Sequence, residues 1–157
     1  MLAALAELKR DPSTLPPLEV GAFGLALRLL APRDLADQAL IVRLGAWRAE
    51  HMSHYPTQFA AVTPEGTARW LRELVLGDAD RLMFLVVDAD DPYGSPPYGH
   101  LGFDHAHPTE PTIGLSNVLK GDRARLPPGA MDAAEERMLA WAHEALGAET
   151  ILSLIHI

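Results

Sequence analysis

Apolar residues recur along this chain in two patterns, one typical of strands and the other of helices. Four stretches are rich in apolar residues over six to eight positions and are bounded by Gly, Pro or Asp, which is typical of strands. They are residues 25–30, 81–88, 98–104 and 112–119. The last three follow one another through connections that contain Pro, so they predict an antiparallel meander.

The other pattern repeats apolar residues at a spacing of three and four, which predicts amphipathic helices. One helix is expected over residues 32–51, with Leu40, Leu44 and Trp47 on one face. A second begins with Thr63 as its N-cap and Pro64 at its first helical position, and it ends before Gly77. Its apolar stripe consists of Trp70, Leu71, Leu74 and Val75.

A third helix is expected over residues 132–147, where DAAEERMLAWAHEALG is amphipathic and ends at Gly147. Asp132 and Glu135 have the spacing of a capping box at its start. The residues expected to face inward are Met138, Trp141, Ala142 and Ala145. ILSLIHI, residues 151–157, predicts a buried strand after this helix.

The first 24 residues differ from the rest in composition. MLAALAELKR predicts a short amphipathic helix, and DPSTLPPLEVG is a Pro-rich connector that we expect to hold no regular structure. We therefore divide the chain into an N-terminal helix and linker, residues 1–24, and a domain over residues 25–157. Within the first strand of that domain, we expect Arg28 to point outward and to tolerate replacement by Ala.

Composition narrows the class of protein. A length of 157 residues with 48% hydrophobic content is that of one domain with one core. The chain has no Cys, which excludes disulfides and thiol nucleophiles and is compatible with a reducing, cytoplasmic location. No apolar run reaches the roughly 20 residues of a membrane helix, and a net charge of -8 disfavours binding to nucleic acid. We expect no partner of either kind.

The order of elements from residue 25 onward resembles the fold of the GCN5-related N-acetyltransferases (GNAT): strand, two helices, three-stranded meander, basic loop, helix, strand. This resemblance implies an α+β fold with a mixed, mostly antiparallel sheet. It also implies an acyltransferase that moves an acetyl group from acetyl-CoA to a primary amine. The acceptor could be a small molecule, an amino sugar or a protein N-terminus. The alternative is a non-catalytic module of the same fold, fused to a larger enzyme.

The stretch 112–147 resembles the segment with which that family holds acetyl-CoA. By resemblance, the pantetheine arm lies along the strand that contains Val118 and Leu119, one of whose N–H groups stabilises the oxyanion. The pyrophosphate lies at the start of the next helix, where N–H groups and the helix dipole favour an anion. Two alignments of RLPPGA with the family loop remain open. The expected coenzyme residues are Val118, Leu119, Lys120, Arg123, Arg125, Gly129, Ala130 and Met131.

The acetyl transfer that the resemblance implies needs a base, an oxyanion stabiliser and a proton for the leaving thiolate. The candidates on the neighbouring strands are His100, Ser116 and Asn117, and only His100 has an ordinary pKa near neutrality. By resemblance, His51, His54 and Tyr55, between the first two helices, contact the acceptor. Asp104, His105 and His107 are competent metal ligands, but they stand at a turn before Pro108, and we expect no metal site.

The end of the sequence carries a separate expectation. LSLIHI, residues 152–157, is the translation of CTG TCT CTT ATA CAC ATC, the end sequence of a transposon-based sequencing adapter used in metagenomic libraries. We therefore expect the natural chain to diverge near Ile151, so that the domain is truncated and lacks the family's final helix and hairpin strands. Such a fragment would be inactive, and its exposed last strand could form a homodimer.

Overall fold

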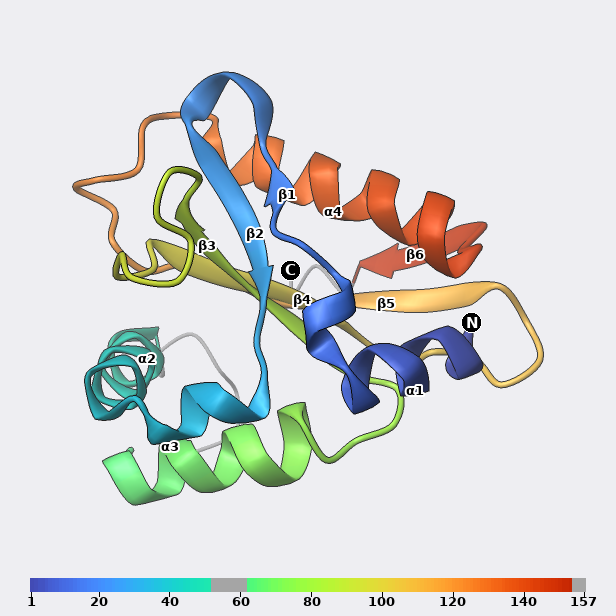
Figure 1. The fold of residues 1–157 in the computed structure, drawn as a ribbon, viewed down its shortest axis with the longest axis horizontal. Helices are drawn as coiled ribbons and strands as arrows, with labels where there is room; N and C mark the ends of the chain where they lie inside the picture. The colour runs from blue at the N-terminus through green and yellow to red at the C-terminus, as the bar shows by residue number, and fades with distance from the viewer. Residues whose placement is uncertain (52–61, 154–157) are drawn as a thin grey trace.

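The computed structural model describes residues 1–51 and 62–153. Six strands form one sheet in which the order in space follows the order in the sequence (Figure 1). This arrangement confirms the predicted α+β class and the predicted meander. The strands are β1 (Leu18–Glu19), β2 (Leu25–Leu29), β3 (Leu82–Asp88), β4 (Gly99–Asp104), β5 (Thr112–Lys120) and β6 (Thr150–Ser153).

The pairing of the strands changes at the end of the sheet. The first five strands pair antiparallel, with Leu27 opposite Val86 and Phe84 opposite Leu101. β6 is parallel to β5, because the chain returns through a helix before it re-enters the sheet. Such a crossover is the usual connection between parallel strands. The sheet is therefore mixed and mostly antiparallel, as predicted.

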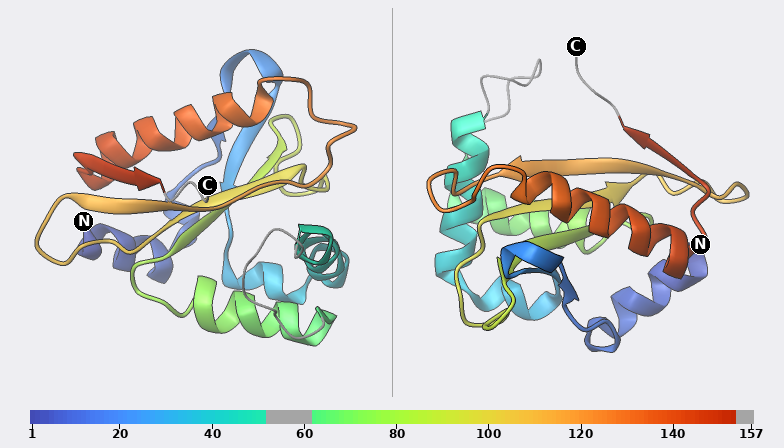
Figure 2. Two further views of the ribbon diagram at one scale, coloured as in Figure 1. Left: turned by 180° about the vertical axis from the view of Figure 1, so that it is seen from behind. Right: turned by 90° about the horizontal axis from the view of Figure 1, so that it is seen from above.

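In the described part of the chain, four α-helices cover the sheet on two sides. α4 (Ala130–Leu146) packs on one face with α1 (Leu2–Arg10) beside it, while α2 (Gln38–His51) and α3 (Pro64–Trp70) pack on the other (Figures 1 and 2). α3 continues into a π-helical turn, η5 (Leu71–Val75). Two hydrophobic cores result, one on each face of the sheet.

Local signals explain most helix ends. The Thr63 hydroxyl accepts a hydrogen bond from the N–H of Gly66 at 3.0 Å, which confirms the predicted N-cap. The helix predicted over residues 32–51 is instead divided into a 3-10 turn, η3 (Pro32–Ala36), and α2. Asp37 separates them because its backbone is extended and its carboxylate accepts the N–H of Leu40 at 3.0 Å. Asp37 therefore acts as a second N-cap that the sequence analysis missed.

The N-terminal 24 residues pack against the sheet. Leu5 is fully buried, and β1 pairs with β2 through Leu18. The Pro-rich connector forms two 3-10 turns, η1 (Pro12–Thr14) and η2 (Gly21–Phe23), so the expectation of no regular structure was wrong. Pro12 is compatible with the first position of such a turn because no N–H is required there.

Three of the four inward residues predicted for the last helix are buried, namely Met138, Trp141 and Ala142. Ala145 is exposed instead, because it lines an open hollow of about 220 Å³ between α1 and the last turns of α4. Leu74 is also exposed, at 46%. It lies in η5, where the N–H of Leu76 bonds to the carbonyl of Leu71 and the widened turn changes which residues face inward.

Candidate active site

A β-bulge interrupts β5 near its middle. Gly102 of β4 lies opposite Ser116, but His100 lies opposite Leu119, so two residues of β5 occupy the space of one on β4. The first extra residue, Asn117, has a φ of 53°, in the left-handed region. The extra residue reverses the alternation of the strand: Ile113 joins the core under α4, whereas Leu119 joins the core under α2.

The same part of β5 lies beyond its pairing with β6. The two strands pair only from Thr112 to Leu115 on β5 and from Thr150 to Ser153 on β6. From Ser116 onward, the described residues of β6 do not cover this edge of β5 (Figure 1). Val118 is 45% exposed there. The bulge therefore stands beside an edge at which backbone groups can meet a bound molecule.

His100 is buried behind the bulge on the face covered by α2. Its side chain is 2% exposed, and its Nδ1 lies 2.6 Å from the carbonyl oxygen of Asn117. The ring lies 6.4 Å from that of Trp47. Burial lowers the pKa of His100 to about 4, against the hydrogen bond to Asn117, which raises it. This environment argues against a general base that must meet a solvent-borne substrate near neutrality.

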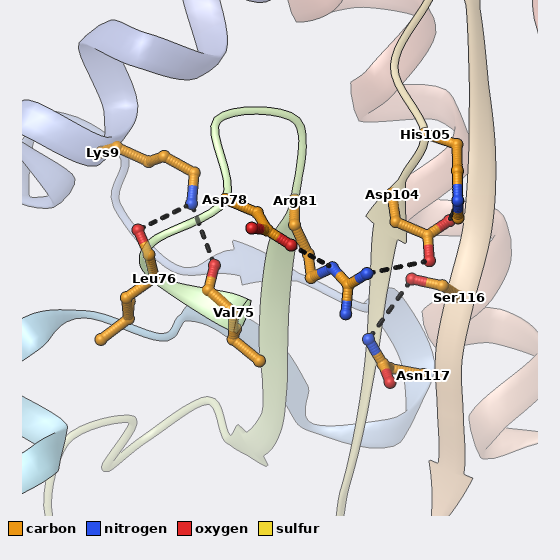
Figure 3. Close-up of polar contacts among 9 residues, drawn as sticks. All are labelled: Lys9, Val75, Leu76, Asp78, Arg81, Asp104, His105, Ser116 and Asn117. Atoms are coloured by element: carbon orange, nitrogen blue, oxygen red, sulfur yellow. Dashed lines mark hydrogen bonds and ion pairs between the residues drawn. The ribbon is translucent and has the colours of Figure 1, made fainter. Parts of the chain in front are cut away.

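Ser116 and Asn117 lie at the bulge itself, and the amide Nδ2 of Asn117 donates to the Ser116 hydroxyl at 3.4 Å (Figure 3). Close by, Asp104 is the centre of a polar cluster. Its carboxylate accepts a hydrogen bond from His105 Nδ1 at 2.9 Å and lies 3.8 Å from a guanidinium nitrogen of Arg81. The sequence analysis missed Arg81, because the residue stands one position before β3 and nothing in its neighbourhood predicts a partner on β4.

The start of α4 differs from its prediction. The helix begins at Ala130, and its N-cap is Gly129 with a φ of 81°. No side chain caps this end, so the predicted capping box of Asp132 and Glu135 is wrong. The helix begins two residues earlier than expected because Gly129, without a Cβ, can adopt the left-handed conformation that the chain needs here.

The loop between β5 and α4 is anchored at its first residues. A Cβ on Gly121 would lie 2.2 Å from the ring of Trp47, so the loop passes directly against α2. The N–H of Asp122 donates to the carbonyl of Tyr98 at 2.7 Å. Only Gly allows this approach, and the loop therefore leaves the sheet in one direction.

Two of the loop's cations have defined partners. Arg125 stacks on the Tyr98 ring at 4.4 Å and donates to its hydroxyl at 3.1 Å. Arg123 donates to His51 Nε2 at 2.8 Å, and His51 Nδ1 donates to the carbonyl of Trp47 at 2.8 Å. The positive charge that the sequence places in this loop is therefore held close to α2 and to β4.

Structural comparisons show which known proteins share this arrangement. No family model and no curated protein matches the sequence. Among solved structures, similarity is found to a probable GNAT-family acetyltransferase from Chromobacterium violaceum, with a TM-score of 0.61, 23% identity, and coverage of 85% of this chain and 66% of that one.

Two further structures are similar. One is a GCN5-related N-acetyltransferase from Brucella melitensis (TM-score 0.60, 17% identity, 85% of this chain and 57% of that one). The other is the ribosomal-protein-S5-alanine acetyltransferase from Vibrio fischeri (TM-score 0.65, 17% identity, 88% and 73%). The chain has the GNAT fold. It spans less than two thirds of the length of the Chromobacterium and Brucella proteins.

Within this GNAT fold, the residues expected to hold the coenzyme follow one path. It runs from Val118, Leu119 and Lys120 at the end of β5, through the loop that contains Arg123 and Arg125, to Gly129, Ala130 and Met131 at the start of α4. Of the expected acceptor residues, His51 lies at the end of α2 beside that loop. His54 and Tyr55 lie outside the described residues.

The turn after β4 uses His107 for its own hydrogen bonds, because His107 Nδ1 accepts the N–H of Glu110 at 3.0 Å. In residues 1–51 and 62–153, no group of three or more His, Asp or Glu side chains is placed to hold a metal ion. None of the helices in the described part of the chain has the length and apolar character needed to span a bilayer.

Proposed function

We propose that this chain is an acyltransferase domain that moves an acetyl group from acetyl-CoA to a primary amine. The observation that carries the proposal is the bulge at Asn117, which stands beside the edge of β5 that described β6 residues leave unpaired. A bulge turns backbone N–H groups out of the ladder, and fixed N–H groups are effective stabilisers of an oxyanion. The GNAT fold supports the proposal because its solved relatives are described as acetyltransferases.

The start of α4 fits the pyrophosphate of the coenzyme. Its first N–H groups point along the helix axis, the helix dipole is positive there, and no side chain caps it. A Cβ on Gly129 would find only Phe23 within 4 Å, so a phosphate can approach the backbone. Arg123 and Arg125 add positive charge in a chain with a net charge of -8. Asp132, in the first turn, opposes this charge in part.

In the reaction, the amine nitrogen forms a bond to the thioester carbon and gives up one proton, the bond from carbon to sulfur breaks, and the leaving thiolate takes up one proton. We assign the oxyanion to the N–H of Val118 or Leu119, next to the bulge. Ser116 and Asn117, partly accessible at the same place, are assigned hydrogen bonds to the acetyl group or to the amine. The acceptor could be a small molecule, an amino sugar or a protein N-terminus.

Isothermal titration with coenzyme A tests the assignment. We expect Arg125→Glu and Gly129→Asp each to weaken binding by about tenfold or more, because each places negative charge beside the pyrophosphate. Arg72→Glu, which reverses an exposed charge on η5, is the matched control and should leave the affinity unchanged. Equal affinity in all four proteins would refute this coenzyme site.

A second measurement separates catalysis from binding. Release of free thiol from acetyl-CoA is followed with a panel of small amines, amino sugars and N-terminal peptides, both for this chain and for the full-length protein that the sequence analysis expects. Turnover with any of them supports the transferase, and the preferred acceptor identifies its class. Binding of coenzyme without turnover of any acceptor would favour the alternative, a non-catalytic module of the same fold.

A further inference from the structure

His100 is the one buried histidine of the described chain, and the proposed reaction gives it no role. A carbonyl oxygen can only accept a hydrogen bond, so the 2.6 Å contact with Asn117 requires the proton on Nδ1 of His100. Burial lowers the pKa of His100 to about 4, so the ring is neutral near pH 7 and Nε2 carries a lone pair. Nε2 is buried and has no hydrogen-bond partner among the described residues.

An unpartnered Nε2 has a cost that an apolar side chain would avoid. Leaving a buried acceptor unsatisfied costs about 1–3 kcal/mol. The ring packs near Trp47, a contact that Phe would also provide. What His supplies and Phe does not is the Nδ1–H donor, directed at the bulge. The hydrogen bond to Asn117 is therefore the feature that distinguishes this side chain from ordinary core filling.

Asn117 needs such a partner. Asn enters the left-handed region more readily than most other residues with a side chain, but the conformation still has a cost that surrounding contacts must offset. At the bulge, the β4–β5 ladder passes from the pair Gly102–Ser116 directly to the pair His100–Leu119, so Asn117 has no partner residue of its own in the register. The Nδ1–H of His100 instead donates a hydrogen bond to the Asn117 carbonyl at this gap in the register.

We propose that His100 is a positioning residue that fixes the β5 bulge through its Nδ1–H bond to the Asn117 carbonyl. By holding the peptide between Asn117 and Val118 in one orientation, it sets the direction of the N–H groups of Val118 and Leu119 at the open edge. The consequence for catalysis rests on the proposed function, whereas the geometry of the bulge does not.

Two substitutions separate the contribution of the His100 ring from that of its N–H donor. His100→Phe keeps a ring beside Trp47 and removes the donor. His100→Asn removes the ring and keeps an N–H donor at the same distance from the backbone. His143→Phe is the control, because His143 Nδ1 also donates to a backbone carbonyl, that of Ala148 at 3.0 Å, at the other end of α4.

Backbone NMR on the three variants tests the geometry without any ligand. In the parent chain, the Cα and Cβ shifts of Asn117 should have left-handed values, and His100 should show a protonated Nδ1. His100→Phe should lose the left-handed shifts or broaden the signals of Asn117 and Val118. His100→Asn and His143→Phe should keep them. Left-handed shifts at Asn117 in a folded His100→Phe protein would overturn the proposal.

Turnover tests the consequence for catalysis. Losing one aligned oxyanion donor reduces kcat by about 100- to 1,000-fold, so misdirecting it should reduce kcat by at least about tenfold. We expect His100→Phe to show this loss of kcat, while its affinity for coenzyme A, measured by titration, changes less than about threefold. His100→Asn should recover most of kcat. An altered bulge with unchanged kcat would overturn the positioning role. If neither the unmodified chain nor the full-length protein shows turnover, the proposed function is refuted instead, and the NMR result still decides the role of His100.

Discussion

The cores on the two faces of the sheet differ in polarity. Under α4 and α1, the core is entirely apolar, from Leu27 and Phe84 in the strands to Met138 in the helix. Under α2 and α3, the apolar core is smaller. Within residues 1–51 and 62–153, the four buried polar or charged residues all lie on this second side, namely Arg28, Asp34, Thr67 and His100.

This difference indicates that one face mainly stabilises the fold, whereas the other fixes the positions of particular groups. An apolar interface is non-directional and tolerates repacking, whereas a buried polar group must find its partner in one geometry. The bulge, the loop contact at Gly121 and the Arg28–Asp34 pair all lie on or against the polar side. We infer that the α4 face supplies most of the stability and that the α2–α3 face fixes the candidate site. Substitutions on the two faces should therefore fail in different ways.

The largest effect is expected on the apolar face, for Trp141→Ala. Trp141 is 5% exposed and packs edge-on against Phe84 with ring centroids 5.2 Å apart. Truncating it should lower the free energy of unfolding by about 3–5 kcal/mol through lost burial and the cavity left behind. Chemical denaturation measures the change, and the exposed Leu74→Ala is the control. An unchanged midpoint for Trp141→Ala would show that this core does not carry the stability assigned to it.

On the polar face, Arg28→Ala should cost about 3 kcal/mol, because it leaves the Asp34 carboxylate buried without its cation. The guanidinium donates to both Asp34 oxygens at 2.9 and 3.0 Å, and each side chain is 8% exposed. Arg33→Ala is the matched control, since Arg33 stacks on the same Tyr93 ring but is exposed.

A double-mutant cycle sharpens this second prediction. If the cost comes from an unpaired charge, Arg28→Met combined with Asp34→Leu should be more stable than either single variant. If the stability losses of the two single variants add in the double variant, Arg28 and Asp34 do not stabilise each other. The α4 face and the α2–α3 face would then differ less than we infer.

Arg28 also shows where sequence reasoning stops. Alternation within LALRLL correctly places Arg28 on the face opposite Leu27 and Leu29, but it cannot tell that this face is covered. The cover comes from η3, whose Asp34 also accepts the N–H of Ala31 at 2.8 Å. The expectation that Arg28 points to solvent and tolerates Ala was therefore wrong. A buried charge is invisible in the sequence when its partner comes from an element that the pattern assigns elsewhere.

The fold was predictable because its signals are local. The strands of the meander, the Thr63 cap and the end of α4 at Gly147 all follow from neighbours in sequence. The strand predicted to be buried after α4 is an exception, because Thr150, Leu152 and Ser153 of β6 are exposed. The bulge could not be predicted, because the register of two strands decides it. Asn is enriched at positive φ, but Asn117 alone does not locate a bulge. The same holds for the burial of His100, which depends on the position of α2. Local chemistry thus predicted the elements, while contacts between elements decided the geometry of the candidate site.

A smaller effect concerns acid. Burial lowers the pKa of His100 to about 4, while an unfolded His titrates near 6.5, so between these values only the unfolded chain binds the proton. The free energy of unfolding should therefore fall as pH decreases, by about 1.5 kcal/mol from pH 6.5 to 5. Denaturation at both pH values should show this loss in the parent chain and a smaller one in His100→Phe. Equal losses in the two proteins would mean that folding does not lower the pKa of His100.

The smallest effect is expected at the exposed edge of the polar side, where Asp104 ends β4. The hydrogen bond from His105 to the Asp104 carboxylate, together with its charge, raises the pKa of His105. A raised pKa favours the folded chain below the unfolded value and loses this effect as pH rises through the folded one. The His105 side chain is 76% exposed, so solvent screens its interaction with Asp104. The effect is therefore measured by titrating His105 rather than by denaturing the protein. Following the His105 ring by NMR, we expect Asp104→Asn to lower its pKa and Asp90→Asn, an exposed carboxylate in the next turn of the meander, to leave it unchanged. If Asp104→Asn leaves the pKa of His105 unchanged, the contact between Asp104 and His105 in Figure 3 does not persist in solution. Order on the polar side would then be confined to the part that helices cover.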